Sequence, residues 1–210
     1  MADRYHSFSE LARETLAGRD YTVRARRGRG SPVLILAPHG GRIEEGTSEL
    51  ALRIACRDHS LFMFEGLRPT GNRELHIGST RFDHPQCLSM LARSALAIGI
   101  HGCRGEAQIY VGGLEQRLTG LIVAHLTLAG LPATASVPRH LAGRDPRNLC
   151  NRGTCGRGAQ LEVTMDLRTS AAATHIASAV RASIAAYLSL PPVRLHGAFA
   201  CDSFISTSTR

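Results

Sequence analysis

An unbroken apolar run at residues 33–37 constrains the fold of this chain more than any other feature of its sequence. The five residues, VLILA, predict a strand buried on both faces, as in a parallel sheet covered by helices. A proline ends the run, and His39, two glycines and Glu44 follow before helical spacing begins near residue 47. In open α/β sheets, ligands bind just outside the carboxyl ends of the strands. The stretch therefore predicts an α/β fold with a functional site at the end of this strand.

The pairing of His39 with Glu44 indicates a metal site. Imidazole and carboxylate are both good zinc ligands, and catalytic zinc sites commonly use two histidines and one carboxylate. The glycines between the two residues let the loop bend so that the side chains can converge. The alternative is structural: His39 would pack at the strand end, and Glu44 would begin the helix, where its charge suits the dipole. One such pair does not decide between the two interpretations.

The same pattern recurs further along the chain. Residues 95–100 form another apolar run, and His101 and a glycine follow it directly. Two such strands side by side would bring His39 and His101 to the same edge of the sheet, which favours the metal site over the structural alternative. Glu45 is the substitute carboxylate if Glu44 points away from the histidines.

Glu162 is a carboxylate within an otherwise apolar run at residues 160–165. On an alternating strand it could simply face solvent. It could instead face the edge of the sheet where His39 and His101 are expected, and act as a base toward a water molecule. The sequence alone leaves both interpretations open.

The remaining elements are expected around this centre, in a single domain over residues 1–210. Further strands are predicted at residues 21–23, 61–64 and 109–113, and helices at residues 7–17, 47–57, 86–94, 115–129 and 171–188. Residues 1–30 hold the first helix and a basic turn, and residues 191–210 form a tail. The long loop at residues 68–85 is of the kind that often carries function. It contains Arg73, His76, Arg81 and Asp83.

The charge of the chain favours an anionic partner. Lys and Arg number 25 against 17 Asp and Glu, a net charge of +8, and many of the basic residues are arginines suited to carboxylate recognition. Nucleic acid is poorly supported as that partner, because Trp is absent, aromatic residues make up 5% and no nucleic-acid-binding motif is visible.

The six cysteines are scattered and do not suggest a disulfide scaffold, so we expect them to be mostly free thiols. Cys150 and Cys155 leave open a weak C-x4-C metal site. No apolar run is long enough to span a membrane, and the first residues carry no classical export signal. We expect a soluble monomer, cytoplasmic as synthesised, with release to the medium by lysis as an open alternative.

Five segments together resemble the phage-type zinc-dependent poly-γ-glutamate hydrolases. They are APHGGRIEEGTSELA, ELHIGSTRFDHP, IGIHGCRG, NLCNRG and QLEVTMDLR, and they span roughly residues 30–170 in the expected order. The combination is far more specific than any one segment. Gly78 and His84 depart from the residues expected there, which leaves the exact substrate open. The resemblance implies a compact zinc-carboxypeptidase-like fold, with a mixed, mostly parallel sheet flanked by helices.

The resemblance also implies roles for individual residues. His39, Glu44 and His101 would bind one zinc ion per chain, and Glu162 would be the general base. Candidates for contacts with the polyanionic substrate are Arg152, Arg104, Asn151 and His76. Two alternatives stay open: a related zinc amidohydrolase for a small N-acyl amino acid or a peptidoglycan peptide, and a non-catalytic basic protein that binds nucleic acid.

Overall fold

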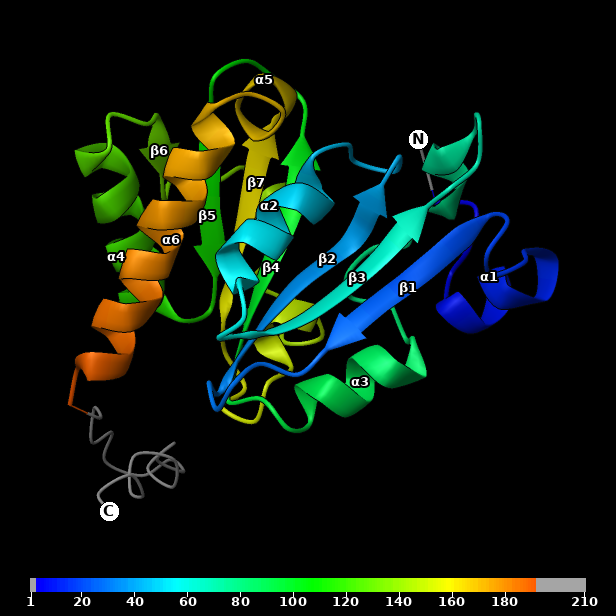
Figure 1. The fold of residues 1–210 in the computed structure, drawn as a ribbon, viewed down its shortest axis with the longest axis horizontal. Helices are drawn as coiled ribbons and strands as arrows, with labels where there is room; N and C mark the ends of the chain where they lie inside the picture. The colour runs from blue at the N-terminus through cyan, green and yellow to red at the C-terminus, as the bar shows by residue number, and fades with distance from the viewer. Residues whose placement is uncertain (1–2, 192–210) are drawn as a thin grey trace.

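The computed structural model of this chain describes residues 3–191, which form one mixed sheet with helices on both sides (Figure 1). The strands are β1 (Tyr21–Arg26), β2 (Val33–Gly41), β3 (Ser60–Gly66), β4 (Leu96–Cys103), β5 (Ile109–Gly113), β6 (Ala133–Thr134) and β7 (Ala159–Thr164). The α-helices are α1 (Phe8–Glu14), α2 (Thr47–Ala55), α3 (Pro85–Leu91), α4 (Gln116–Leu128), α5 (Met165–Arg168) and α6 (Ala172–Ser189). Short 3₁₀ helices are η1 (Asn72–Leu75), η2 (Arg139–Leu141) and η3 (Leu149–Asn151).

Parallel strands form the centre of the sheet. The strand order is β1-β3-β2-β4-β7-β5-β6, in which β3, β2, β4 and β7 run parallel. β1 and β5 each pair antiparallel with a neighbour. The central strands are buried almost throughout, because helices cover both faces of the sheet. The predicted α/β fold with a mixed, mostly parallel sheet is confirmed.

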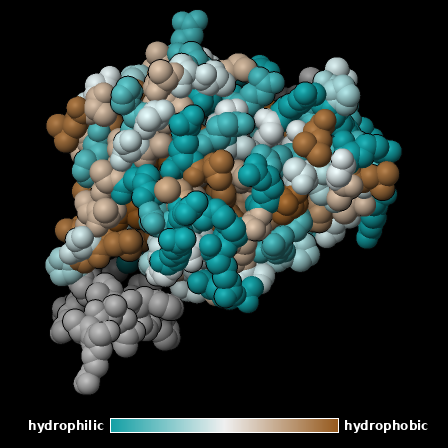
Figure 2. Space-filling view, in the orientation of Figure 1, coloured by the Kyte–Doolittle hydropathy of each residue, from teal (hydrophilic) through white to brown (hydrophobic). Residues whose placement is uncertain are grey.

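Each face of the sheet has its own hydrophobic core. Helices α2, α4 and α6 cover one face with residues such as Ile54, Ile122 and Ile176, and Figure 1 views the molecule from this side. In the same orientation, Figure 2 shows a largely hydrophilic surface with scattered apolar residues, as amphipathic helices produce. Helices α1 and α3 and the loop after β3 cover the other face, with an aromatic cluster that includes Phe8 and Phe82.

Strand β2 is longer than the apolar run predicted. It continues through Pro38 and His39 to Gly41, and its pairing with β3 shifts register between Ala37 and Gly40. A bulge of this kind accommodates the proline and re-aims the neighbouring side chain. The histidine therefore belongs to the strand itself, which holds it more rigidly than a loop would.

Two further differences concern short or basic segments. β1 continues to Arg26, so the first part of the basic run is an edge strand rather than a turn. Charged side chains are common on edge strands because they discourage pairing with other chains. The helix α5 and the two-residue strand β6 were not predicted, because elements this short carry no measurable periodicity.

Most of the cysteines in the described part of the chain are free, as expected. The free thiols are Cys56, Cys87, Cys103 and Cys150. Cys155 is bonded in a disulfide, so the expectation fails at this position. A disulfide-bonded sulfur is no thiolate ligand, which excludes a metal site shared by Cys150 and Cys155. Cys201 lies outside the described residues, as does the predicted tail beyond residue 191. Among residues 3–191, no helix is long and apolar enough to cross a membrane.

Asp20 links the segment just after α1 to the loop after β3 and gives a test of the fold. Its carboxylate accepts hydrogen bonds from the Leu16 amide at 2.8 Å and from Arg19 and Arg68. These bonds hold the pKa of Asp20 well below its usual range. We predict that Asp20→Asn lowers the free energy of unfolding at pH 7, and that the difference narrows below about pH 4, where the unfolded carboxyl protonates. Urea denaturation of the wild type and of Asp20→Asn, at pH 7 and below about pH 4, measures the free energy of unfolding. An equal difference between the two proteins under both conditions would contradict the prediction.

Candidate metal centre

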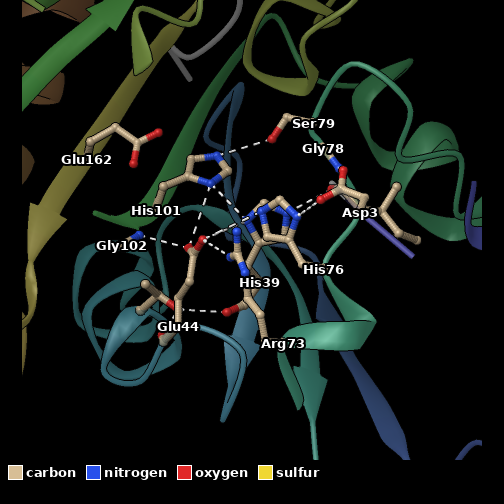
Figure 3. A network of polar contacts seen from close by, with 12 residues as sticks. Asp3, His39, Glu44, Arg73, His76, Gly78, Ser79, His101, Gly102 and Glu162 are labelled. Carbon is tan, nitrogen blue, oxygen red and sulfur yellow. Dashed lines mark hydrogen bonds and ion pairs between the residues drawn. The ribbon is translucent and has the colours of Figure 1, made fainter. Parts of the chain in front are cut away.

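Two histidines and a carboxylate meet at the carboxyl end of the sheet. His39 comes from β2 and His101 from β4, and these strands are direct parallel neighbours. Their Nδ1 atoms lie 3.1 Å apart. Glu44, in the loop after β2, places Oε1 3.2 Å from His39 Nδ1 and Oε2 3.9 Å from His101 Nδ1 (Figure 3). The predicted convergence of the two strand ends is therefore found in the structure.

Backbone contacts fix the loop that carries Glu44. Its amide donates to the His39 carbonyl at 2.9 Å, which closes the turn, and its Oε2 accepts from the Gly102 amide at 2.8 Å. Gly46 precedes helix α2 with φ at 86°, a conformation that favours glycine, and an added Cβ would lie 2.9 Å from the Arg168 carbonyl oxygen. The sequence of the loop thus directs Glu44 inward, whereas Glu45 is exposed.

The three side chains fit a bound divalent metal ion. One ligand atom from each of His39, Glu44 and His101 lies within 4.8 Å of the others, and the two histidines are 2% and 4% exposed. His39 Nε2 donates to the Ile77 carbonyl oxygen at 2.8 Å, which leaves the lone pair of Nδ1 toward the other two ligands. Two imidazoles and one carboxylate with lone pairs converging on one point form a donor set that suits zinc.

At neutral pH the surroundings keep Glu44 ionised and His101 neutral, and they favour a positive charge on His39. Burial alone would raise the pKa of Glu44, but the charge and hydrogen bond of His39 outweigh it and lower that pKa to about 2. Burial and the neighbouring His39 lower the pKa of His101 to about 3, so its ring is neutral. Burial also opposes a charged His39, but the Glu44 carboxylate outweighs burial and raises its pKa. The cluster therefore favours positive charge at its centre, which a metal ion supplies.

Glu162 lies beside this cluster without belonging to it. Glu162 on β7 is the register partner of His101 on β4, and partners in paired strands face the same side of the sheet. Its side chain is buried, and Gln160 Nε2 donates to its Oε1 at 2.8 Å. Burial and the charge of Glu44 raise the pKa of Glu162 well above its usual range. The simpler interpretation, that the Glu162 side chain faces solvent, is wrong for this structure.

Comparison with known proteins places the chain in a family. The model of the poly-gamma-glutamate hydrolase family matches residues 5–183. The chain belongs to this family. It is 41% identical over 173 residues to the SPbeta prophage-derived protein YoqZ of Bacillus subtilis (strain 168), a match that covers 80% of this chain and 61% of YoqZ. The chain thus spans about three fifths of the length of that relative.

Solved structures agree with this assignment. A bacteriophage poly-gamma-glutamate hydrolase matches with a TM-score of 0.84 and 31% identity, over 89% of this chain and 99% of the phage chain. YndL in a zinc-free apo form matches with a TM-score of 0.82 and 32% identity, over 90% and 100% of the chains. A metallo-carboxypeptidase from Burkholderia cenocepacia has a TM-score of 0.50 at 12% identity, over 80% and 61%, and shows likeness of fold alone.

In this member of the family, the long loop after β3 supports both histidines of the centre. The Ile77 carbonyl holds His39, and Ser79 Oγ lies 3.4 Å from His101 Nε2. The ring of His76 stacks on His39 with centroids 3.9 Å apart, and its Nε2 lies 3.8 Å from Glu44 Oε1. The length of the loop indicated a functional segment, but no pattern in the sequence pointed to the carbonyl of Ile77 or the hydroxyl of Ser79.

Three residues predicted to bind substrate differ in their placement. Asn151 is buried and uses its side chain to brace backbone groups of the surrounding loops, such as the Gly143 carbonyl. Arg152 precedes Gly153, and Gly153 packs against the Ala95 carbonyl at the amino end of β4. His101, in contrast, lies near the carboxyl end of β4. Arg104 is exposed just beyond the carboxyl end of β4, and its side chain makes no hydrogen bond or ion pair among residues 3–191. These placements do not test the substrate contacts, which stay predictions for all three residues.

Arg168 is a buried neighbour of the centre that the sequence analysis did not single out. Its guanidinium donates to the Glu45 carbonyl at 2.6 Å and to the Val163 carbonyl at 2.8 Å. An added Cβ on Gly102 would lie 2.7 Å from the guanidinium carbon. Arg168 thereby links the loop of Glu44 to strand β7. Its place at the end of the QLEVTMDLR segment was the one available signal.

The contrast between two adjacent glutamates tests the centre. We predict that Glu44→Gln, which removes the anionic ligand and keeps its shape, lowers bound zinc from about one per chain to well under half. Glu45→Gln alters an exposed side chain and is the matched control, with unchanged zinc content. Metal analysis of the purified variants measures both. Zinc retained by Glu44→Gln and lost by Glu45→Gln would assign the carboxylate ligand to Glu45.

Proposed function

We propose that this chain hydrolyses the γ-glutamyl amide bonds of poly-γ-glutamate at a zinc centre held by His39, Glu44 and His101. The observation that carries the proposal is the convergence of these three side chains at the carboxyl edge of the sheet, in a chain of the poly-γ-glutamate hydrolase family. The zinc-free form described for YndL supports zinc as the metal of this family. All three ligands come from one chain, so a monomer is sufficient for the site.

Three protein ligands would leave one of the four positions around a zinc ion open. A zinc ion bound by three protein ligands supplies a Lewis acid that polarises the amide carbonyl and the attacking water. His101 is neutral and Glu44 contributes the one negative charge of the set, while His39, whose pKa the Glu44 carboxylate raises, would give up its Nδ1 proton to a bound metal ion. The Ile77 carbonyl and Ser79 hydroxyl keep the two rings in place, which preserves the ligand geometry.

Glu162 is the proposed general base. Its carboxylate takes a proton from the attacking water as the water oxygen bonds to the amide carbon, and passes that proton to the leaving nitrogen as the C–N bond breaks. The products are a carboxylic acid and an amine. Gln160 fixes the carboxylate through the 2.8 Å hydrogen bond to Oε1, and Asn148 in turn donates to Gln160 Oε1 at 2.9 Å.

The charge of the chain suits a polymer of free α-carboxylates. All 25 basic residues are arginines, which can bind a carboxylate through two parallel hydrogen bonds. Arg73, in the long loop, is the arginine that the geometry favours at the rim of the site. Its side chain is 59% exposed, and its Nη1 lies 4.0 Å from Glu44 Oε1. It joins Arg152, Arg104, Asn151 and His76 as a candidate for substrate binding.

Cleavage of poly-γ-glutamate with and without a chelator, followed by product sizing, tests the proposal against its alternatives. We expect chelator-sensitive cleavage within the polymer that leaves short oligomers. A related amidohydrolase for small N-acyl amino acids or peptidoglycan peptides would leave the polymer intact and cleave only small amides. A basic nucleic-acid-binding protein would cleave neither and would bind no zinc. Either of these two outcomes would contradict the proposed substrate.

Glu162→Gln separates the base from the metal ligands. The substitution keeps size and hydrogen-bonding shape but removes the basic site. We predict a loss of at least about 10²-fold in kcat, the lower end of acid–base contributions, with zinc content unchanged. Glu49→Gln, at an exposed glutamate on α2, is the control and should retain wild-type activity. Loss of zinc along with activity would make Glu162 a ligand, and near wild-type activity would remove it from the mechanism.

Arg73→Ala tests recognition of the polyanion. Because the guanidinium is largely exposed, we predict a modest rise in KM for poly-γ-glutamate, about 2- to 5-fold, and a smaller rise at high salt. Arg57→Ala changes an exposed arginine just after α2, near the amino end of β3, and is the control for loss of net charge. Steady-state kinetics at two ionic strengths measure both variants. Equal effects of the two substitutions would show that Arg73 acts only through overall charge.

A further inference from the structure

Asp3 organises the loop segment that contacts the metal centre. Its Oδ1 lies 2.7 Å from His76 Nδ1, and its Oδ2 accepts from the Gly78 amide at 2.9 Å and from Arg81 Nη2 at 2.7 Å. The Asp3 side chain is 12% exposed. It lies just before residues 5–183, the part that the family model matches. Figure 3 shows Asp3 on the side of His76 that faces away from Glu44.

The contact with Asp3 determines which nitrogen of His76 carries the hydrogen. An ionised carboxylate only accepts hydrogen bonds, so His76 Nδ1 must be the donor. In a neutral ring, Nε2 is then an acceptor. Stacking on His39, with centroids 3.9 Å apart, holds the ring so that this Nε2 faces Glu44.

His76 Nε2 lacks a donor among the described residues. Glu44 Oε1 lies 3.8 Å away, which is too far for a hydrogen bond, and it is itself an acceptor. The His76 side chain is only 16% exposed. His76 Nε2 is not one of the fully buried polar atoms without a partner, so water reaches it, and the donor of a bound ligand can replace that water.

The chemistry of the proposed substrate supplies one uncharged donor in every repeat. A γ-glutamyl chain offers carboxylates and carbonyls as acceptors, and its amide N–H groups as donors. We propose that His76 Nε2 accepts the amide N–H of the bound γ-glutamyl chain, and that Asp3 is a positioning residue that holds His76 in the tautomer this contact requires. This inference rests on the proposed function.

Asp3→Asn tests the tautomer directly. The Asn Oδ1 should keep the bonds from Gly78 and Arg81, which both need an acceptor, so that Nδ2 faces His76 and donates to Nδ1. The hydrogen of the His76 ring then moves to Nε2. When substrate binds, this Nε2–H and the amide N–H of the γ-glutamyl chain are both donors and cannot form a hydrogen bond with each other. We expect kcat/KM for poly-γ-glutamate to fall roughly 10- to 100-fold, with zinc content and Tm close to wild type.

Imidazole ¹⁵N NMR, with and without zinc, reads the tautomer independently of activity. The expected result is Nδ1–H for His76 in the wild type and Nε2–H in Asp3→Asn. Arg81→Gln removes one partner of Asp3 without touching His76, and should keep both the wild-type tautomer and the wild-type rate. His76→Phe should lower kcat/KM as much as Asp3→Asn, with no further loss in the double variant.

The possible results separate this inference from the proposed function. Nε2–H in the wild type overturns the role of Asp3, whether or not the polymer is cleaved. A switched tautomer with unchanged kcat/KM overturns the contact with the substrate. If Asp3→Asn fails to fold, the wild-type tautomer and His76→Phe still decide. Absence of polymer cleavage by the wild type would defeat the proposed function and the substrate contact, while the tautomer measurement still tests the hydrogen bond to Asp3.

Discussion

The parallel pairing of β2 with β4 is the constraint on which the rest of the site depends. It brings two strand ends to one edge of the sheet, so that residues 62 positions apart place their Nδ1 atoms 3.1 Å from each other. Two unprotonated imidazole nitrogens beside a buried carboxylate are costly to hold together without a positive charge between them. The apolar cores on both faces of the sheet stabilise these strands and offset that cost. Rigidity at the strand ends is what makes the cluster a preformed binding site.

Neighbouring elements supply the other side chains of the site. Strand β7 pairs with β4 and sets Glu162 at the level of His101, while Arg168 links β7 to the loop of Glu44. The loop after β3 covers the opposite side and supplies the hydrogen-bond partner of His39. Strand β7 pairs with the strand of His101, whereas the loop after β3 contacts His39 and His101 directly. The three ligands, the candidate base and the supporting hydrogen bonds thus come from separate stretches of sequence.

The sequence allowed prediction of the residues that follow buried strands, because an apolar run followed by His-Gly marks both the strand and its end. His39, Glu44 and His101 were identified in this way, and Glu162 was identified as a carboxylate within an apolar run. The partners of Asn151 and the placement of Arg152 could not be predicted, because they depend on how irregular loops pack. The contacts of Arg168 and Asp3 likewise join segments distant in sequence. The spacing of apolar residues predicts which side of a helix or strand is buried, but it does not predict which loops contact each other.

The central claim is that these three side chains hold one zinc ion, and anomalous diffraction at the zinc absorption edge tests it most directly. In a crystal of the zinc-loaded protein we expect one strong anomalous peak per chain, about 2.0–2.2 Å from His39 Nδ1, His101 Nδ1 and a Glu44 carboxylate oxygen. A peak held by other residues, or the three side chains hydrogen-bonded to one another with no peak between them, would contradict the account.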